Sequence, residues 1–333
     1  MFNPDDDEAN ASWIQRLTAA KLLNDRLAGG VWGHLVGDAM GVPYEFGPPV
    51  PLEQVRWGQQ AAQRAQPPGT WSDDGGLMLA LLDSLVQGAF DTKDQARRAL
   101  DWWRGEAYKP GPVFDIGIAT RGALGRIERG IEPEDAGAAG EHENGNGSLM
   151  RILPIALVGH QAPDAELVSQ AMRASSLTHR HPRSRVTCAV YVLAACQFLR
   201  GARLRASALA KAFDTVAATV GEAELRELDV LKRYPARTGS GYVVDCFWSA
   251  WEAFSGGESY RSVIERAIAY GNDADTTASV AGGLAGIYWG KSGIPDEWLN
   301  AMRGRDIVEP ILGKLLATAG TRERPGFDRA DEA

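Results

Sequence analysis

The sequence has few cysteines and no long apolar run. Cys188, Cys196 and Cys246 are too few for a disulfide framework, and because none belongs to a Cys-x-x-Cys pair, a cysteine zinc site is also disfavoured. Every apolar stretch is broken by glycine or charge well before it could span a membrane. The acidic start of the chain lacks the apolar segment of a signal peptide. These absences predict a globular, cytoplasmic protein without a membrane partner.

Positive charge is also in short supply. The 333 residues include 35 Lys and Arg against 43 Asp and Glu, which gives a formal net charge of −8. A large nucleic-acid footprint needs clustered Lys and Arg, so a nucleic-acid partner is disfavoured. The composition is 44% hydrophobic, which is ordinary for a folded protein that buries a substantial core.

Alternating Val, Ile and Thr runs are scarce, whereas apolar residues recur at spacings of three and four. Helices are therefore predicted at 75–88, 182–200, 203–217, 220–232, 241–255, 258–270 and 276–289. We found no strand pattern, repeat or linker, so we expect an all-α, compact single-domain helical bundle over residues 10–319. The charged segments 1–9 and 320–333 are expected to form mobile tails, and the protein is expected to be a monomer.

Two glycine patterns indicate close helix packing. Segment 276–289 contains Gly282, Gly283 and Gly286, each of which costs a helix about 1 kcal/mol relative to alanine. Gly33, Gly37 and Gly41 recur every four residues near the N-terminus. Each pattern predicts a helix whose backbone lies against a neighbouring element.

Carboxylates gather at two predicted helix starts. Residues 72–74 (SDD) precede the helix at 75–88, and residues 273–276 (DADT) precede the helix at 276–289. Each cluster alone is typical of helix capping. Adjacent carboxylates repel one another, however, and neither cluster has a neighbouring Lys or Arg. The all-oxygen donor set favours a hard divalent cation, Mg²⁺ or Mn²⁺.

Three shorter patterns are weak signals when taken one at a time. Residues 144–148 (NGNGS) form either an Asn-Gly turn or a loop whose N–H groups cradle an anion. His179 precedes a predicted helix, as a helix-start residue or a polar ligand contact, and no second metal motif accompanies it. Asp115 is typical of a helix N-cap.

In combination and in this order, the motifs resemble those of the ADP-ribosylglycohydrolase family, which includes the dinitrogenase reductase-activating glycohydrolases. The segments that carry the resemblance are 37–46 (GDAMGVPYEF), 69–74 (GTWSDD), 115–117 (DIG), 145–151 (GNGSLMR), 178–179 (TH), 241–244 (GYVV), 271–277 (GNDADTT) and 281–286 (AGGLAG). They extend over most of the chain, from about residue 28 to residue 302.

The resemblance implies an all-α fold with a cleft that holds two divalent cations, Mg²⁺ or Mn²⁺. Matched position by position, it assigns the metal ligands to Ser72, Asp73, Asp74, Asp273, Asp275 and Thr276. It assigns catalytic roles to Glu45 and Asp273. It assigns contacts with the substrate to Asp115, Asn146, Gly147, Ser148, His179 and Tyr242.

The activity implied by the resemblance is removal of ADP-ribose from a modified protein, with ADP-ribose as product and N-linked ADP-ribosyl-arginine as the expected substrate. Serine-linked, O-acetyl and nucleic-acid-linked ADP-ribose are alternatives, as is a non-catalytic ADP-ribose-binding protein. The chain departs from the family pattern at Gly75, where the family commonly has threonine, and at Asn272, where it has glycine. Neither departure removes an expected ligand.

Overall fold

The protein was analysed as a computed structural model, which describes residues 4–58 and 66–321. Helices account for the architecture of these residues, which contain only isolated β-bridges and no strand, so the all-α prediction is confirmed. The longer helices are α1 (Pro4–Gly41), α2 (Asp73–Val86), α3 (Thr92–Trp103), α4 (Ile118–Glu128), α7 (Asp164–Ser176), α8 (Pro182–Leu199), α9 (Arg205–Thr219), α10 (Glu222–Arg233), α11 (Val243–Gly256), α12 (Tyr260–Ile268), α13 (Ala274–Trp289) and α15 (Arg305–Thr321). Within the described ranges, no helix is long and apolar enough to cross a membrane.

Short helical segments join these elements. They are η1 (Val42–Tyr44), η2 (Leu52–Gln54), α5 (Pro133–Ala136), η3 (Leu149–Arg151), α6 (Pro154–Gly159), η4 (Lys291–Gly293) and α14 (Asp296–Ala301). All seven helices predicted from periodicity are present, and none of their ends shifts by more than two residues. Helices α2 and α13 each begin two residues before the predicted start, so their acidic motifs form part of the first helical turn.

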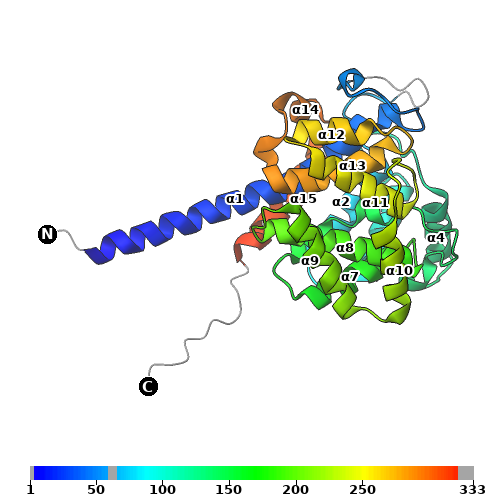
Figure 1. The fold of residues 1–333 in the computed structure, drawn as a ribbon, viewed down its shortest axis with the longest axis horizontal. Helices are drawn as coiled ribbons and strands as arrows, with labels where there is room; N and C mark the ends of the chain where they lie inside the picture. The colour runs from blue at the N-terminus through cyan, green and yellow to red at the C-terminus, as the bar shows by residue number, and fades with distance from the viewer. Residues whose placement is uncertain (1–3, 59–65, 322–333) are drawn as a thin grey trace.

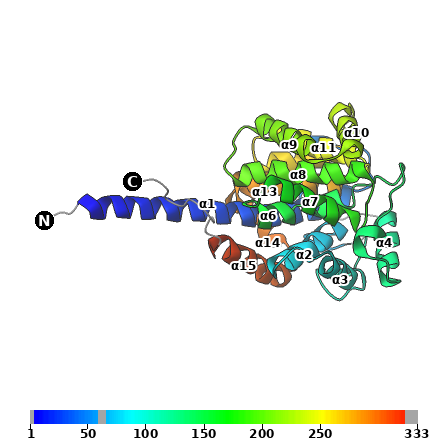
Figure 2. The same cartoon turned by 90° about the horizontal axis from the view of Figure 1, so that it is seen from below.

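The two glycine patterns pack against each other. Helices α1 and α13 run antiparallel through the middle of the molecule (Figures 1 and 2). A Cβ atom on Gly33 would overlap the carbonyl of Gly282, and one on Gly29 would overlap that of Gly286. The pairing continues to Gly41, where a Cβ would lie 2.6 Å from the backbone nitrogen of Asp275. This glycine seam brings the C-terminal end of α1 to the acidic start of α13.

The N-terminal half of α1 projects from the body of the molecule (Figure 1). The helix begins at Pro4, so residues 4–9, which their charge assigned to a mobile tail, are helical. A proline followed by acidic residues is a common helix start, because the fixed φ of proline and the helix dipole both favour it. Residues 322–333, most of the predicted C-terminal tail, lie outside the described residues.

The fold also brings the N-terminal ends of α2 and α13 together near the surface. Helix α8 is buried along almost its whole length and packs between α7, α9 and α11 (Figure 2). The buried core continues into α2 and α13. Residues 274–287 of α13 are all buried. The two acidic helix starts are thereby held by rigid, well-packed helices.

Candidate functional site

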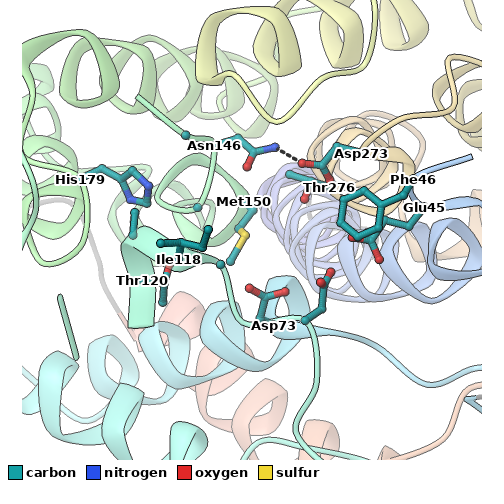
Figure 3. A pocket seen from close by; sticks show the side chains of 15 residues that line it. Glu45, Phe46, Asp73, Ile118, Thr120, Asn146, Met150, His179, Asp273 and Thr276 are labelled. Atoms are coloured by element: carbon teal, nitrogen blue, oxygen red, sulfur yellow. Dashed lines mark hydrogen bonds between the residues drawn. The ribbon is translucent and has the colours of Figure 1, made fainter. Parts of the chain in front are cut away.

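An open cleft of about 200 Å³ lies between the starts of α2, α4 and α13 (Figure 3). Loops after η1, before η3 and before α8 complete it. Its described lining is Glu45, Phe46, Asp73, Asp115, Gly117, Ile118, Ala119, Thr120, Gly145, Asn146, Gly147, Met150, His179, Asp273 and Thr276. Four of these side chains are carboxylates and none is Lys or Arg, so one part of the cleft is strongly acidic.

The start of α2 is held by a carboxylate from α1. Asp38 is completely buried and accepts hydrogen bonds from the backbone nitrogens of Ser72 (3.0 Å) and Gly75 (2.8 Å). It therefore occupies two of the N–H groups that a helix leaves unpaired at its first turn. At Gly75 a Cβ would lie 2.7 Å from the side chains of Leu35 and Trp71, so the structure leaves no room for the threonine common in the family.

Asp74 connects the two helix starts. Its carboxylate accepts hydrogen bonds from the hydroxyl groups of Ser279 (2.6 Å) and Thr276 (3.3 Å) on α13, and from Ser72 (3.3 Å). Asp74 is 1% exposed and is absent from the lining of the cleft. In this structure, Asp74 is thus hydrogen-bonded to the Ser72 hydroxyl and to hydroxyl groups of α13.

The start of α13 presents two further carboxylates. Asp273 lines the cleft, and its Oδ2 accepts a hydrogen bond of 2.9 Å from Asn146 (Figure 3). Asp275 is fully buried, and its Oδ1 accepts the backbone N–H of Thr276. Its Oδ2 has no hydrogen-bond partner among the described residues. A buried, unpartnered carboxylate oxygen costs free energy unless a proton or a cation neutralises it.

One group of carboxylates has the spacing of a cation site. Oxygen atoms of Glu45, Asp115 and Asp275 all lie within 4.8 Å of one another. These residues come from three separate segments, so only the tertiary structure brings them together. Sequence reasoning placed Asp115 among the substrate contacts, but the structure groups it with possible metal ligands.

Burial and mutual repulsion raise the pKa values of the carboxylates in this site. Burial, followed by the charges of Asp74 and Asp115, raises the pKa of Asp73 well above its usual value. Burial and the charge of Glu45 do the same for Asp275. Burial raises the pKa of Asp38 to about 7, against the backbone hydrogen bonds that favour its charged form. So many acids cannot all be ionised here unless a cation balances them, and a divalent metal fits the oxygen-only donor set.

Backbone strain accumulates around the same carboxylates. Phe46, Asp115 and Asn272 have φ values of 56°, 58° and 54°, a left-handed conformation that is uncommon outside glycine. The N–H of Phe46 donates to the Asn272 carbonyl, which ties the Glu45 loop to the start of α13. Strain of this kind persists only where the surrounding structure enforces it, and it often marks functional sites.

The other end of the cleft is built from neutral donors. Helix α4 starts there at Ile118 with Gly117 at its N-cap and without a side-chain cap, so its first backbone N–H groups are available. Opposite it is the loop of Gly145 and Gly147, which packs against the imidazole of His179. A Cβ on Gly147 would lie 2.9 Å from Cε1 of His179, so glycine is needed for this approach.

Two residues expected to contact substrate are not in the cleft. Ser148 is completely buried, and its hydroxyl contacts that of Ser175 and the thiol of Cys188. Tyr242 is half-buried outside the cleft lining and packs edge-on against Tyr234, with ring centroids 5.6 Å apart. The substrate-contact hypothesis for Ser148 is therefore not supported by the structure, because a Ser148 side chain aimed at the cleft would leave the buried polar group around Cys188.

Sequence reasoning missed other residues of the site. Asp38 lies within segment 37–46, but the motif assigns it no role, although an Asp between the glycines of a predicted helix is itself a signal. Ser279 carried no signal, because a serine in a small-residue helix is ordinary. Thr120 and Ile118, which line the cleft from α4, also lay outside every motif.

The chain is similar to known proteins over most of its length. The family model for ADP-ribosylglycohydrolase matches residues 19–325. The ADP-ribosylarginine hydrolase Tri1 of Pseudomonas putida (strain GB-1) is 30% identical, over 95% of this chain and 85% of the relative. The ADP-ribosyl-[dinitrogen reductase] glycohydrolase of Rhodospirillum rubrum is 28% identical, over 90% of this chain and 98% of the relative. A solved structure described as an ADP-ribosylglycohydrolase-related protein complex superposes with a TM-score of 0.74 at 33% identity, covering 90% of this chain and 98% of the other.

Proposed function

The chain belongs to the ADP-ribosylglycohydrolase family, and we propose that it is a metal-dependent hydrolase that cleaves the N-glycosidic bond between ADP-ribose and an arginine side chain of a modified protein. The observation that carries this proposal is the convergence of Glu45, Asp73, Asp115 and Asp273 on one open cleft. Similarity to relatives named as ADP-ribosylarginine hydrolase and ADP-ribosyl-[dinitrogen reductase] glycohydrolase supports it.

We propose that the acidic end of the cleft holds two divalent cations, Mg²⁺ or Mn²⁺. The unpartnered Oδ2 of Asp275 and its spacing to Glu45 and Asp115 support one cation. Asp73 and Asp273, which face the cleft from the two helix starts, are the ligands proposed for the second. The remaining proposed ligands are Ser72, Asp74 and Thr276, which are hydrogen-bonded to one another. Either these hydrogen bonds would rearrange when a cation binds, or the three residues would orient the carboxylates that bind it directly.

The polarity of the cleft gives a bound ADP-ribose one orientation. The acidic end repels a diphosphate, whereas the N–H groups at the start of α4 and around Gly147 attract it. The terminal ribose then lies beside Asp73 and Asp273, with its hydroxyl groups facing these carboxylates. The bond to be cleaved is therefore placed among the carboxylates and near the open side of the cleft.

The reaction adds water across the bond between ribose C1″ and the guanidinium nitrogen. When bound, the cations supply positive charge that orients the ribose hydroxyls and activates a water molecule. We assign to Glu45 the acceptance of a proton from the attacking water, because it lies at the cleft beside Asp115 and Asp275. The oxygen of the water forms the new C1″–O bond, and the proton passes on to the neutral guanidine that leaves when the C1″–N bond breaks. Asp273, oriented by the amide of Asn146, is placed to stabilise the positive charge that develops on the ribose ring as the C–N bond breaks.

The arginine linkage is the form that the charge of the site favours. The guanidinium of ADP-ribosyl-arginine is cationic, and the carboxylate charge that the two proposed cations leave unbalanced attracts it. Serine-linked ADP-ribose, O-acetyl-ADP-ribose and ADP-ribosylated nucleic acid lack this cation, and the net charge of −8 disfavours the last of them further. A family member that only binds ADP-ribose would not need the unpartnered Asp275 oxygen.

The decisive experiment compares release of ADP-ribose from arginine-, serine-, acetyl- and nucleotide-linked substrates with Mg²⁺, Mn²⁺ or EDTA. We expect turnover of the arginine-linked substrate that EDTA abolishes. Asp273→Asn and Asp275→Asn should lose metal binding in calorimetry, whereas Asp229→Asn, at an exposed ion pair with Arg233, serves as the matched control. Full turnover by Glu45→Gln would remove Glu45 from the mechanism, and metal-independent turnover would refute the metal proposal.

A further inference from the structure

Arg151 is a buried cation without a carboxylate partner among the described residues. It ends the η3 turn that follows the Gly147 loop, and it is 5% exposed. Its NH2 group donates to the carbonyl of Ala174 (3.0 Å) and to the hydroxyl of Thr178 (2.9 Å). A guanidinium is costly to bury without a counter-charge, so its retention here calls for a specific role.

The hydrogen bonds of Thr178 determine how His179 carries its proton. The Thr178 hydroxyl lies 3.0 Å from Nδ1 of His179 and already accepts a hydrogen bond from Arg151. Arginine can only donate, and the hydroxyl of this buried threonine has no hydrogen bond to another acceptor among the described residues, so we assign its single hydrogen to Nδ1. Nδ1 is then an acceptor, and a neutral imidazole with Nδ1 as acceptor has its hydrogen on Nε2.

Nε2 lies on the edge of the imidazole that meets the glycine loop. A Cβ atom on Gly145 would lie 3.3 Å from Nε2, and one on Gly147 would lie 3.5 Å from it. His179 also lines the cleft (Figure 3). The N–H group is therefore presented at the neutral end of the cleft, beside the backbone of the loop.

The same arrangement opposes protonation of the ring. Burial, together with the positive charge of Arg151, lowers the pKa of His179 to about 3. The Thr178 hydroxyl and the glycine loop, which contact the ring, are neutral, and Ser175 donates to the His179 carbonyl. The nearby thiol of Cys188, which contacts Ser148, stays protonated because burial raises its pKa. Burial lowers the pKa of Arg151 to about 10, which leaves it charged at neutral pH.

We propose that Arg151 and Thr178 are positioning residues that hold His179 as the neutral, Nε2-protonated tautomer, so that it offers the ligand one N–H donor of fixed direction. The proposal rests on the proposed function, because it assigns the recipient of this hydrogen bond to an acceptor oxygen of the bound ADP-ribose. The donor has no charge of its own and does not titrate over the physiological range. The ligand's affinity at this end of the cleft is thereby made independent of pH.

The tautomer is measured directly by long-range ¹H–¹⁵N NMR of uniformly ¹⁵N-labelled protein without ligand. We expect His179 to show a protonated Nε2 and an unprotonated Nδ1, with no titration between pH 5 and 8. A protonated Nδ1, or a titration near pH 6.5, overturns the proposal. This measurement involves neither substrate nor metal, so it stands even if the proposed hydrolase activity fails.

Two pairs of variants test the roles of the positioning residues. Thr178→Val removes the hydroxyl and keeps the shape, whereas Thr178→Ser keeps the hydroxyl. In titrations with ADP-ribose and Mg²⁺, we expect Thr178→Val to weaken binding about fivefold, equivalent to one hydrogen bond, and to show mixed tautomers. Thr178→Ser should match the wild type in both measurements. Equal affinity and equal NMR spectra for the two variants contradict the role of Thr178.

Arg151→Met removes the charge, and Arg151→Lys retains it. We expect the pKa of His179 to be higher in Arg151→Met than in the wild type, because the charge of Arg151 is lost while the burial remains, and ADP-ribose affinity to become more dependent on pH. Arg151→Lys should show neither effect. If Arg151→Met does not fold, the wild-type spectrum and the Thr178 pair still decide the outcome. A wild-type spectrum with protonated Nε2 in a protein that does not bind ADP-ribose would confirm the tautomer and refute the proposed ligand.

Discussion

Replacement of Gly41 by alanine tests whether the glycine seam positions the acidic site. A Cβ at this position would lie 2.7 Å from the carbonyl oxygen of Ala274 and 2.6 Å from the nitrogen of Asp275. Both atoms belong to the backbone and cannot rotate away. The nearest backbone atom, Cα of Asp275, would lie 2.3 Å from the added Cβ and so falls short of the 3.4 Å of an ordinary contact by about 1.1 Å. The end of α1 and the start of α13 must therefore separate by about 1 Å.

The expected effect on stability is modest, and the expected effect on the site is large. Overpacking costs about 1–3 kcal/mol, and it is partly offset by the roughly 1 kcal/mol that alanine gains over glycine in a helix. A displacement near 1 Å of reacting groups lowers rates by about a hundredfold. We therefore expect Gly41→Ala to fold, to lose at most about 2 kcal/mol of unfolding free energy, and to lose most of its metal affinity and turnover.

The assay combines chemical denaturation, calorimetric titration with Mn²⁺ and release of ADP-ribose from an arginine-linked substrate. Gly313→Ala on α15 is the matched control, because nothing among the described residues lies within 4 Å of a Cβ there. The control should gain about 0.5–1 kcal/mol and keep its activity. If Gly41→Ala binds Mn²⁺ and turns over substrate as Gly313→Ala does, the seam does not position the carboxylates.

Three further outcomes follow from the same geometry. In metal-free protein, the free energy of unfolding should fall as pH rises from about 4 to about 7. The reason is that Asp38, with its pKa raised from 3.8 to about 7, binds more protons in the folded state than in the unfolded state. Thermal unfolding with and without Mn²⁺ measures this pH dependence, which the metal should reduce. Gly147→Ala should weaken ADP-ribose binding at least tenfold, with little change in melting temperature, because the methyl group meets His179 in the cleft; unchanged affinity in calorimetry would contradict it. Ser279→Ala should cost about 1–3 kcal/mol, because the Asp74 oxygen that it bonds stays buried; a denaturation curve that coincides with the wild type would show that another donor replaces it.

Periodicity and motifs predict local structure well in this chain. Apolar spacing located helices such as α8, whose start at Pro182 and approximate end were both foreseen, because helical propensity and capping act within a few residues. The acidic helix starts at residues 73–74 and 273–275 were also readable from sequence, since adjacent carboxylates without a cation nearby are unusual. The charged composition of residues 4–9 did not indicate that they are helical, although the same residues also suit a helix start.

Contacts between residues far apart in the chain could not be predicted from local sequence patterns. The glycines of α1 pack on those of α13, although the two helices are more than 200 positions apart in the chain. Neither glycine pattern indicates by itself that the other is its packing partner. Asp115 joins Glu45 and Asp275, Asp38 caps α2 and Ser148 turns away from the cleft, because burial and hydrogen bonding of each side chain are settled by whichever elements pack around it. The sequence specifies which acids are available, and the antiparallel seam specifies which of them meet.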